Sequence, residues 1–86
     1  MARHISRAEK FELEKGLAIE IIRRRGGKWR RKTPRKEETV SVEEVVAEIM
    51  RHPSYAISFD KHVTRVIINL ENVYGQAYEQ IIFEKI

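Results

Sequence analysis

The sequence predicts a mainly α-helical domain with three helices and a small β element at its C-terminal end. Two capping boxes, each followed by apolar residues at helical spacing, predict helices over residues 6–25 and 42–52. A third apolar pattern, with a glycine just past its end, predicts a helix over residues 60–74, and residues 76–86 fit a terminal strand or β-ribbon. With 42% hydrophobic residues, the chain (residues 1–86) is expected to form a single small domain.

The first helix begins at a capping box, Ser6 and Glu9, and ends at the glycine pair Gly26 and Gly27. Its apolar residues cover more than half of the helix circumference: Phe11, Leu13, Leu17, Ala18, Ile19, Ile21 and Ile22. A helix with so broad an apolar surface needs more than one neighbour. We therefore expect either a central core helix or a helix that also forms a homodimer contact.

The second helix begins at the capping box of Ser41 and Glu44 and ends before Pro53, because proline disfavours helical geometry in the residue that precedes it. One face is apolar and is expected to be buried: Val42, Val45, Val46, Ile49 and Met50. The opposite face is expected to meet solvent: Glu43, Ala47, Glu48 and Arg51.

Residues 63–86 allow two interpretations. Helical spacing places six apolar residues on one face: Val63, Val66, Ile67, Leu70, Val73 and Tyr74. Alternating spacing instead places Thr64, Val66, Ile68 and Leu70 on one face, and β-branched residues favour a strand. An N-cap at Ser58 or Asp60, the stop at Gly75 and the longer helical match favour the helix. The alternative is an α+β fold in which residues 63–86 form a β-hairpin.

The order of these elements in residues 41–86 resembles a winged-helix domain. The stretch most similar to the third helix of such domains is HVTRVIINLE, from His62 to Glu71, followed by Tyr74-Gly75. The resemblance implies that this helix enters the major groove of DNA. The outward residues that would then read bases are Lys61, His62, Arg65, Asn69 and Asn72. A solvated helix face would explain the same residues.

The most unusual stretch is residues 23–36, in which nine of fourteen residues are Lys or Arg and none is acidic. The rest of the chain has 8 basic and 13 acidic residues. Two glycines and a proline predict that the stretch is a flexible loop or arm. Because a polyanion would relieve its charge repulsion and release counterions, we expect it to bind a nucleic-acid backbone. The expected contacts are Arg23, Arg24, Arg25, Lys28, Arg30, Arg31, Lys32, Arg35 and Lys36, with Trp29 either stacking on a base or folded into the core.

These features predict a small nucleic-acid-binding protein, with DNA favoured over RNA only because of the winged-helix resemblance. One alternative is an RNA- or ribosome-associated basic protein. Another, from a different functional class, is an interaction module that dimerises through the first helix. Salt dependence distinguishes nucleic-acid binding from the interaction module, because binding to phosphates weakens steeply as the salt concentration rises.

Several classes of protein are not expected from this composition. Cysteine is absent, the histidines are scattered and no glycine-rich loop follows a strand, so we expect no enzyme, metal site or cofactor. No apolar run reaches the about 20 residues of a membrane span, and the basic start leads into no signal-like apolar run. A cytoplasmic protein is expected, and its 35% of charged residues would suit a thermophile.

Overall fold

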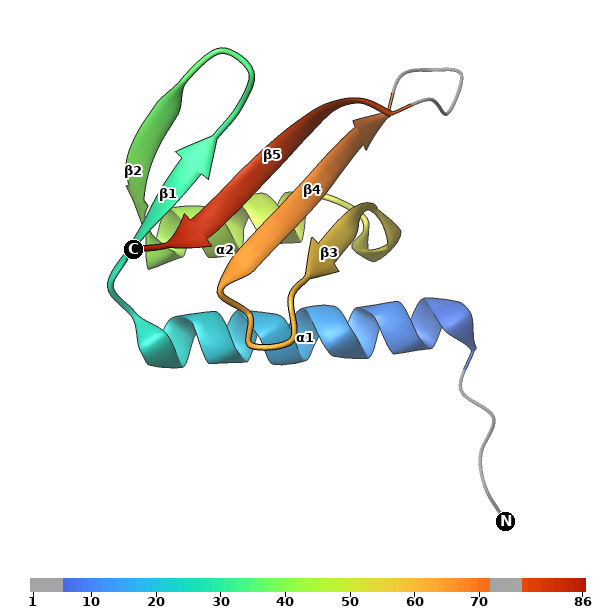
Figure 1. The fold of residues 1–86 in the computed structure, drawn as a ribbon. Coiled ribbons are helices and arrows are strands. Elements are labelled where there is room, and N and C mark those ends of the chain that lie inside the picture. Colours follow the sequence, from blue (N-terminus) through green and yellow to red (C-terminus); the bar gives the residue numbers. More distant parts are fainter. Residues whose placement is uncertain (1–5, 72–76) are drawn as a thin grey trace.

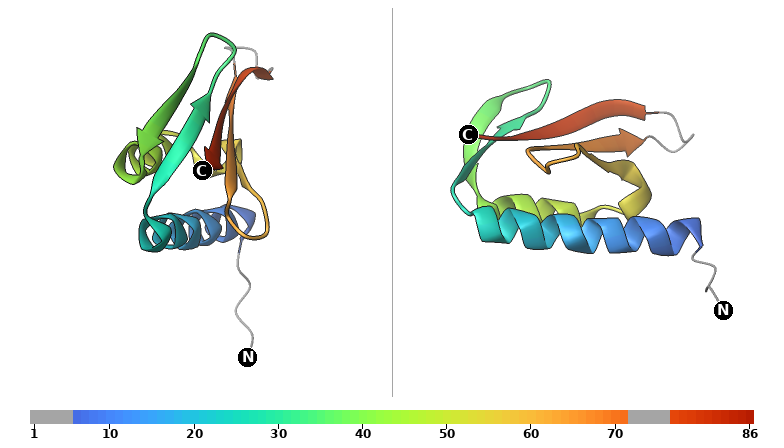
Figure 2. Two further views of the ribbon diagram at one scale, coloured as in Figure 1. Left: turned by 60° about the vertical axis from the view of Figure 1, so that its left-hand side comes forward. Right: turned by 60° about the horizontal axis from the view of Figure 1, so that its bottom comes forward.

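A five-stranded antiparallel sheet forms one layer of the fold, and two helices lie together on one side of it (Figures 1 and 2). The structure is a computed structural model, and it describes residues 6–71 and 77–86. The helices are α1 (Arg7–Arg25) and α2 (Val42–Arg51), followed by the 3-10 turn η1 (Ser54–Ala56). The strands are β1 (Lys28–Lys32), β2 (Glu37–Ser41), β3 (Ile57–Phe59), β4 (Arg65–Glu71) and β5 (Ala77–Lys85), in the order β2-β1-β5-β4-β3.

The predicted three-helix, winged-helix-like fold is wrong, because the described part of residues 60–74 contains a turn and β4 but no helix. Alternation of β-branched residues, rather than helical spacing, describes this segment, since Val66 and Ile68 are both fully buried on one face of β4. The strands β4 and β5 pair as an antiparallel hairpin, which is the arrangement of the α+β alternative. The ends of the predicted third helix and terminal strand that fall in residues 72–76 lie outside the described residues.

Both of the remaining predicted helices begin at their capping boxes. The Ser6 hydroxyl accepts a hydrogen bond from the Glu9 backbone N–H at 3.1 Å, and the Ser41 hydroxyl accepts one from the Glu44 N–H at 3.3 Å. At the other end of α1, Gly26 adopts a positive φ of 59°, a conformation that glycine tolerates without strain. Local sequence therefore determines where these two helices start and where the first one stops.

The core lies between the sheet and the two helices. Its largest fully buried side chains are Trp29, Phe83, Ile22, Ile49, Ile68, Val45, Val46 and Val66. Two expectations for α2 are wrong: Met50 is 63% exposed, and Glu48 is only 8% exposed because it receives a guanidinium from the sheet. The buried face of α2 therefore includes the charged Glu48, which pairs with Arg31 of β1, and leaves out the apolar Met50.

Trp29 belongs to this core and is 0% exposed, so of its two expected roles the structure supports the one in which it packs inside. Its indole N–H is buried and has no hydrogen-bond partner within the described part of the chain. An unpaired buried donor is costly, but the large apolar ring contributes burial that outweighs it. Trp29 is therefore a packing residue that anchors β1 against the helices.

Replacing Trp29 should separate the contribution of the ring from the cost of the unpaired donor. Trp29→Phe keeps an aromatic ring and removes the donor, so we expect the free energy of unfolding to change by less than about 1.5 kcal/mol. Trp29→Ala leaves a cavity and should lower it by about 3–5 kcal/mol. Urea unfolding followed by far-UV circular dichroism measures both values, and equal losses in the two variants would contradict this assignment.

Candidate nucleic-acid interface

The basic stretch at residues 23–36 is divided among three elements instead of forming a loop. Its first three arginines form the last turn of α1, where positive charge is favoured by the helix dipole. Residues 28–32 form β1. The turn to β2 is closed by a hydrogen bond of 2.9 Å from the Thr33 N–H to the Lys36 carbonyl, and Arg35 is exposed within it. The cations are thus held on a helix end and a β-hairpin.

Side-chain alternation along β1 divides its basic residues between two faces of the sheet. Arg31 lies on the helix side with Trp29, where its guanidinium is 3.2 Å from Glu48 of α2 and 3.8 Å from Glu38 of β2. Since Glu48 is nearly buried, this ion pair fixes α2 to the sheet. Arg31 is therefore a structural residue, and neither it nor Trp29 is available for the contact predicted from the sequence.

The other basic residues of β1 alternate with the buried Trp29 and with Arg31, so they face the opposite side of the sheet. No described helix covers that side (Figure 2). We call this side the open face. Strand pairing defines two rows that cross it. One row is Thr39, Arg30, Glu84 and Arg65; the next is Glu37, Lys32, Ile82, Ile67 and Ser58. Lys28 continues the cationic column along β1.

Two carboxylates lie among the cations of the open face. Glu84 Oε1 is 2.7 Å from Lys32 Nζ, and Glu37 Oε1 is 3.0 Å from Arg30 Nε. The hydrogen bond from Lys32 lowers the pKa of Glu84, desolvation opposes this, and the charges of Lys32, Arg65 and Arg30 lower it further. A glutamate that several cations stabilise in its ionised form marks a region of positive potential. The sequence alone did not show this role of Glu84, which only the strand register reveals.

The fold brings a second basic segment to the end of α1. Arg25 Nη1 donates a hydrogen bond of 2.6 Å to the carbonyl of Val63, in the turn between β3 and β4. Lys61 and His62 are exposed in that turn. Backbone hydrogen bonds close the same end of the sheet, since the Ile86 N–H donates to the Lys28 carbonyl at 3.2 Å and the Lys85 N–H donates to the Thr64 carbonyl at 2.8 Å. Residues separated by about half of the sequence therefore become neighbours.

The recognition helix implied by the winged-helix resemblance is absent from the described residues. Lys61 and His62 lie in a turn, and Arg65 and Asn69 lie in β4 with their backbones hydrogen-bonded in the sheet. Asn72 lies outside the described residues. Because β4 is one strand of a five-stranded sheet, it cannot enter a major groove as a single helix does, and the predicted base reading by a groove-inserted helix is wrong.

Asp60 holds the turn that carries Lys61 and His62. Its carboxylate accepts hydrogen bonds from the Thr64 N–H and hydroxyl, both at 2.6 Å, and from the Arg65 N–H at 2.8 Å. Val63 has a φ of 53°, which a β-branched residue rarely adopts, so these bonds stabilise a strained backbone. Desolvation raises the pKa of Asp60, but the hydrogen bonds from Thr64 and Arg65 outweigh it and lower the pKa to about 2.

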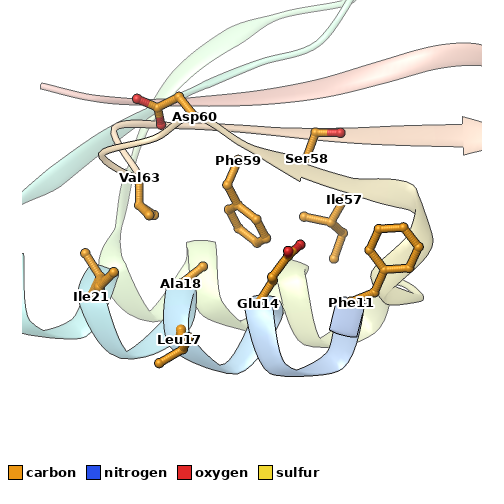
Figure 3. Close-up of a pocket in the computed structure, with 10 residues that line it drawn as sticks. All are labelled: Phe11, Glu14, Leu17, Ala18, Ile21, Ile57, Ser58, Phe59, Asp60 and Val63. Carbon is orange, nitrogen blue, oxygen red and sulfur yellow. The ribbon is translucent and has the colours of Figure 1, made fainter. Parts of the chain in front are cut away.

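An apolar groove of about 450 Å³ lies on the helix side, between α1 and β3 (Figure 3). Phe59 and Val63 point from β3 and its turn toward α1, which contributes Phe11 and Ala18 to the groove. Leu17 also lines this groove and is 60% exposed, and Leu13, one helical turn before it on α1, is 57% exposed. The broad apolar surface predicted for the first helix is thus only partly covered within one chain.

No protein-family model, curated protein or solved structure matches this chain. Within residues 6–71 and 77–86, no cluster of three His, Cys, Asp or Glu residues is arranged to hold a metal ion. In the same residues, no helix has both the length and the apolar character to cross a membrane.

The turn at Asp60 should make stability sensitive to acid. Because the pKa of Asp60 in the folded state lies below its usual 3.8, the ionised carboxylate contributes stability above that pH, and the contribution is lost as the pH falls to about 2. The free energy of unfolding of the wild type should therefore fall more steeply across this interval than that of Asp60→Asn. Thr64→Val, which removes only the hydroxyl donor, should lie between them; coinciding acid-unfolding profiles for all three proteins would refute the assignment.

Proposed function

We propose that this protein binds nucleic acid through the open face of its sheet and the adjoining end of α1. The observation that supports this most strongly is the gathering of cations from three separate segments, residues 23–25, 28–32 and 61–65. The turn at residues 61–65 contacts Arg25 at the end of α1, and Arg65 lies in the same cross-strand row as Arg30. The expected phosphate contacts are Arg23, Arg24, Arg25, Lys28, Arg30, Lys32, Lys61 and Arg65, with Arg35 and Lys36 at the tip of the hairpin. Such contacts provide affinity through the release of counterions.

The ion pairs already present on the open face do not oppose this function strongly. The side chains of Arg30 and Glu37 are 46% and 55% exposed, and those of Lys32 and Glu84 are 38% and 36% exposed. Solvent-exposed pairs contribute little to stability, typically about 0–1 kcal/mol. A phosphate can therefore replace Glu37 or Glu84 as the partner of a cation at small cost, while the sheet keeps the cation in place.

The proposal covers both DNA and RNA. The sequence favours DNA only if residues 60–74 form a recognition helix, and the described part of these residues forms a turn and β4 instead. Backbone contacts from lysine and arginine carry no information about the sequence of the ligand. The cationic surface therefore supports a ligand with a sugar-phosphate backbone and does not favour DNA over RNA.

Charge substitutions on the open face should change the affinity for nucleic acid in opposite directions, according to the sign of the charge that is removed. Arg30→Ala combined with Lys32→Ala should reduce the slope of log Kd against log salt by about 2 and weaken binding, whereas Glu84→Gln should tighten binding. Lys10→Ala, on the exposed surface of α1, is the matched control and should change neither. Fluorescence anisotropy with fluorescein-labelled DNA and RNA measures these effects.

Two outcomes of that titration would count against the proposal. The first is an absence of binding to any nucleic acid at ~50 mM salt, where phosphate contacts contribute most. The second is an equal loss of affinity in Lys10→Ala and in the double variant, which would mean that the open face has no special part in binding.

A second candidate function is self-association through α1, which the exposed Leu13 and Leu17 and the adjacent groove favour. The two leucines are one helical turn apart, so they form a short apolar stripe on the outer surface of α1. A second copy of the chain, packed with its α1 against this stripe, would bury both leucines in a symmetric contact. This assembly would leave the open face accessible, because α1 lies on the other side of the sheet (Figure 2).

Substituting the leucine stripe tests self-association directly. Leu13→Asp and Leu17→Asp should each weaken a dimer by more than about tenfold, because they place a charge in an apolar contact. Tyr55→Asp, at a side chain that is 66% exposed in η1, is the control and should have no effect. Sedimentation velocity over a range of concentrations measures the dimer, and a wild type that remains monomeric throughout would exclude this candidate.

A further inference from the structure

Two apolar side chains lie in the middle of the open face. Ile67 of β4 and Ile82 of β5 are directly opposite each other in the strand register, and both are partly exposed. Neither packs against the hydrophobic core, to which the alternate residues Ile68 and Phe83 belong. A pair of β-branched residues stabilises two neighbouring strands. Because both side chains are partly exposed, the pair also forms an apolar area in contact with solvent, surrounded by charged and amide side chains.

Side-chain amides lie next to this pair along β4 and β5, and a cation lies next to it on β1. In the row beyond the isoleucines, the Gln80 side-chain amide donates a hydrogen bond of 2.9 Å to the amide oxygen of Asn69. In the same row as the isoleucines, Lys32 of β1 is the neighbour of Ile82. On the open face, the amide pair and the apolar pair thus occupy successive rows of β4 and β5, and the cations of β1 flank them.

The column of cations along β1 is straight and regular. Lys28, Arg30 and Lys32 are alternate residues of one strand, and alternate residues of a strand are about 7 Å apart. A nucleic-acid backbone lying along this column would direct its bases either away from the sheet or across it, over Ile82 and Ile67. The second orientation brings flat, apolar base faces onto the isoleucine pair.

We propose that the open face binds an unpaired strand of nucleic acid, with bases resting on Ile67 and Ile82 and base edges within reach of Asn69 and Gln80. This inference rests on the proposed function and names its ligand class. In a duplex the base faces are stacked inside the helix, so an apolar platform gains contact only when the bases are unpaired. The amide groups offer both a donor and an acceptor to an exposed base edge.

Electrostatics alone predicts the opposite preference, which makes the inference testable. A duplex has a higher density of phosphate charge than a single strand, and binding to it releases more counterions for each neutralised phosphate. A surface that acts only through its cations should therefore bind duplex at least as tightly as single strand. Tighter binding of the single strand requires a contribution from the bases.

The experiment compares a labelled single strand of about 16 nucleotides with a duplex of the same sequence, at equal salt and on the wild-type protein. We expect the single strand to bind at least about tenfold more tightly. Ile67→Thr and Ile82→Thr keep β-branched side chains suited to strands, and each should reduce this preference about threefold or more while leaving duplex binding unchanged. Met50→Thr, at an exposed apolar residue of α2, is the control.

Each outcome decides something different. Equal or tighter binding of the duplex by the wild type would overturn the single-strand inference but leave the proposed function standing. Isoleucine variants that fold, as shown by circular dichroism, and retain the full preference would remove Ile67 and Ile82 from the site and so overturn the inference as well. Failure of both ligands to bind at ~50 mM salt would overturn the proposed function with it.

Discussion

The alternation of side chains along β1 is the constraint on which the rest of this structure depends. One face of the strand supplies Trp29 to the core and Arg31 to the ion pair with Glu48, and the other face supplies the cationic column of the open face. A shift of one residue in its pairing would bury Arg30 and expose Trp29. The same five residues thus fix the helices to the sheet and hold a high density of charge in solvent.

The sequence predicted those features that depend on neighbours within about one helical turn. The starts of α1 and α2 follow from Ser6 and Ser41, whose hydroxyl groups accept hydrogen bonds from residues three positions on. The predicted third helix failed because its pattern admitted two periods, and pairing with a distant strand selected one of them. Asp60 illustrates the ambiguity, since its carboxylate bonds to residues four and five positions on and stabilises a turn, where an N-cap would have started a helix.

The candidate site was predictable in its charge but not in its geometry. The density of lysine and arginine in residues 23–36 predicts an anionic partner, yet it gives no indication that Arg31 forms an ion pair with Glu48. Neither could local patterns show that Arg25 would contact the turn at Val63, or that Glu84 would lie among the cations, because both depend on tertiary contacts. Ile67 was assigned to a buried helix face, and strand alternation places it on the open face.

The position of β5 in the sheet has a consequence for how the chain folds. This strand follows the other four strands along the chain but is central in the sheet, since it pairs with β1 on one side and with β4 on the other. During synthesis, the helices and the β1–β2 hairpin can form early, but β1 and β4 cannot be joined until β5 has emerged from the ribosome. Until then Trp29 and Val66 lack the strand that lies between them. Folding of the sheet is therefore expected to be a late and cooperative event.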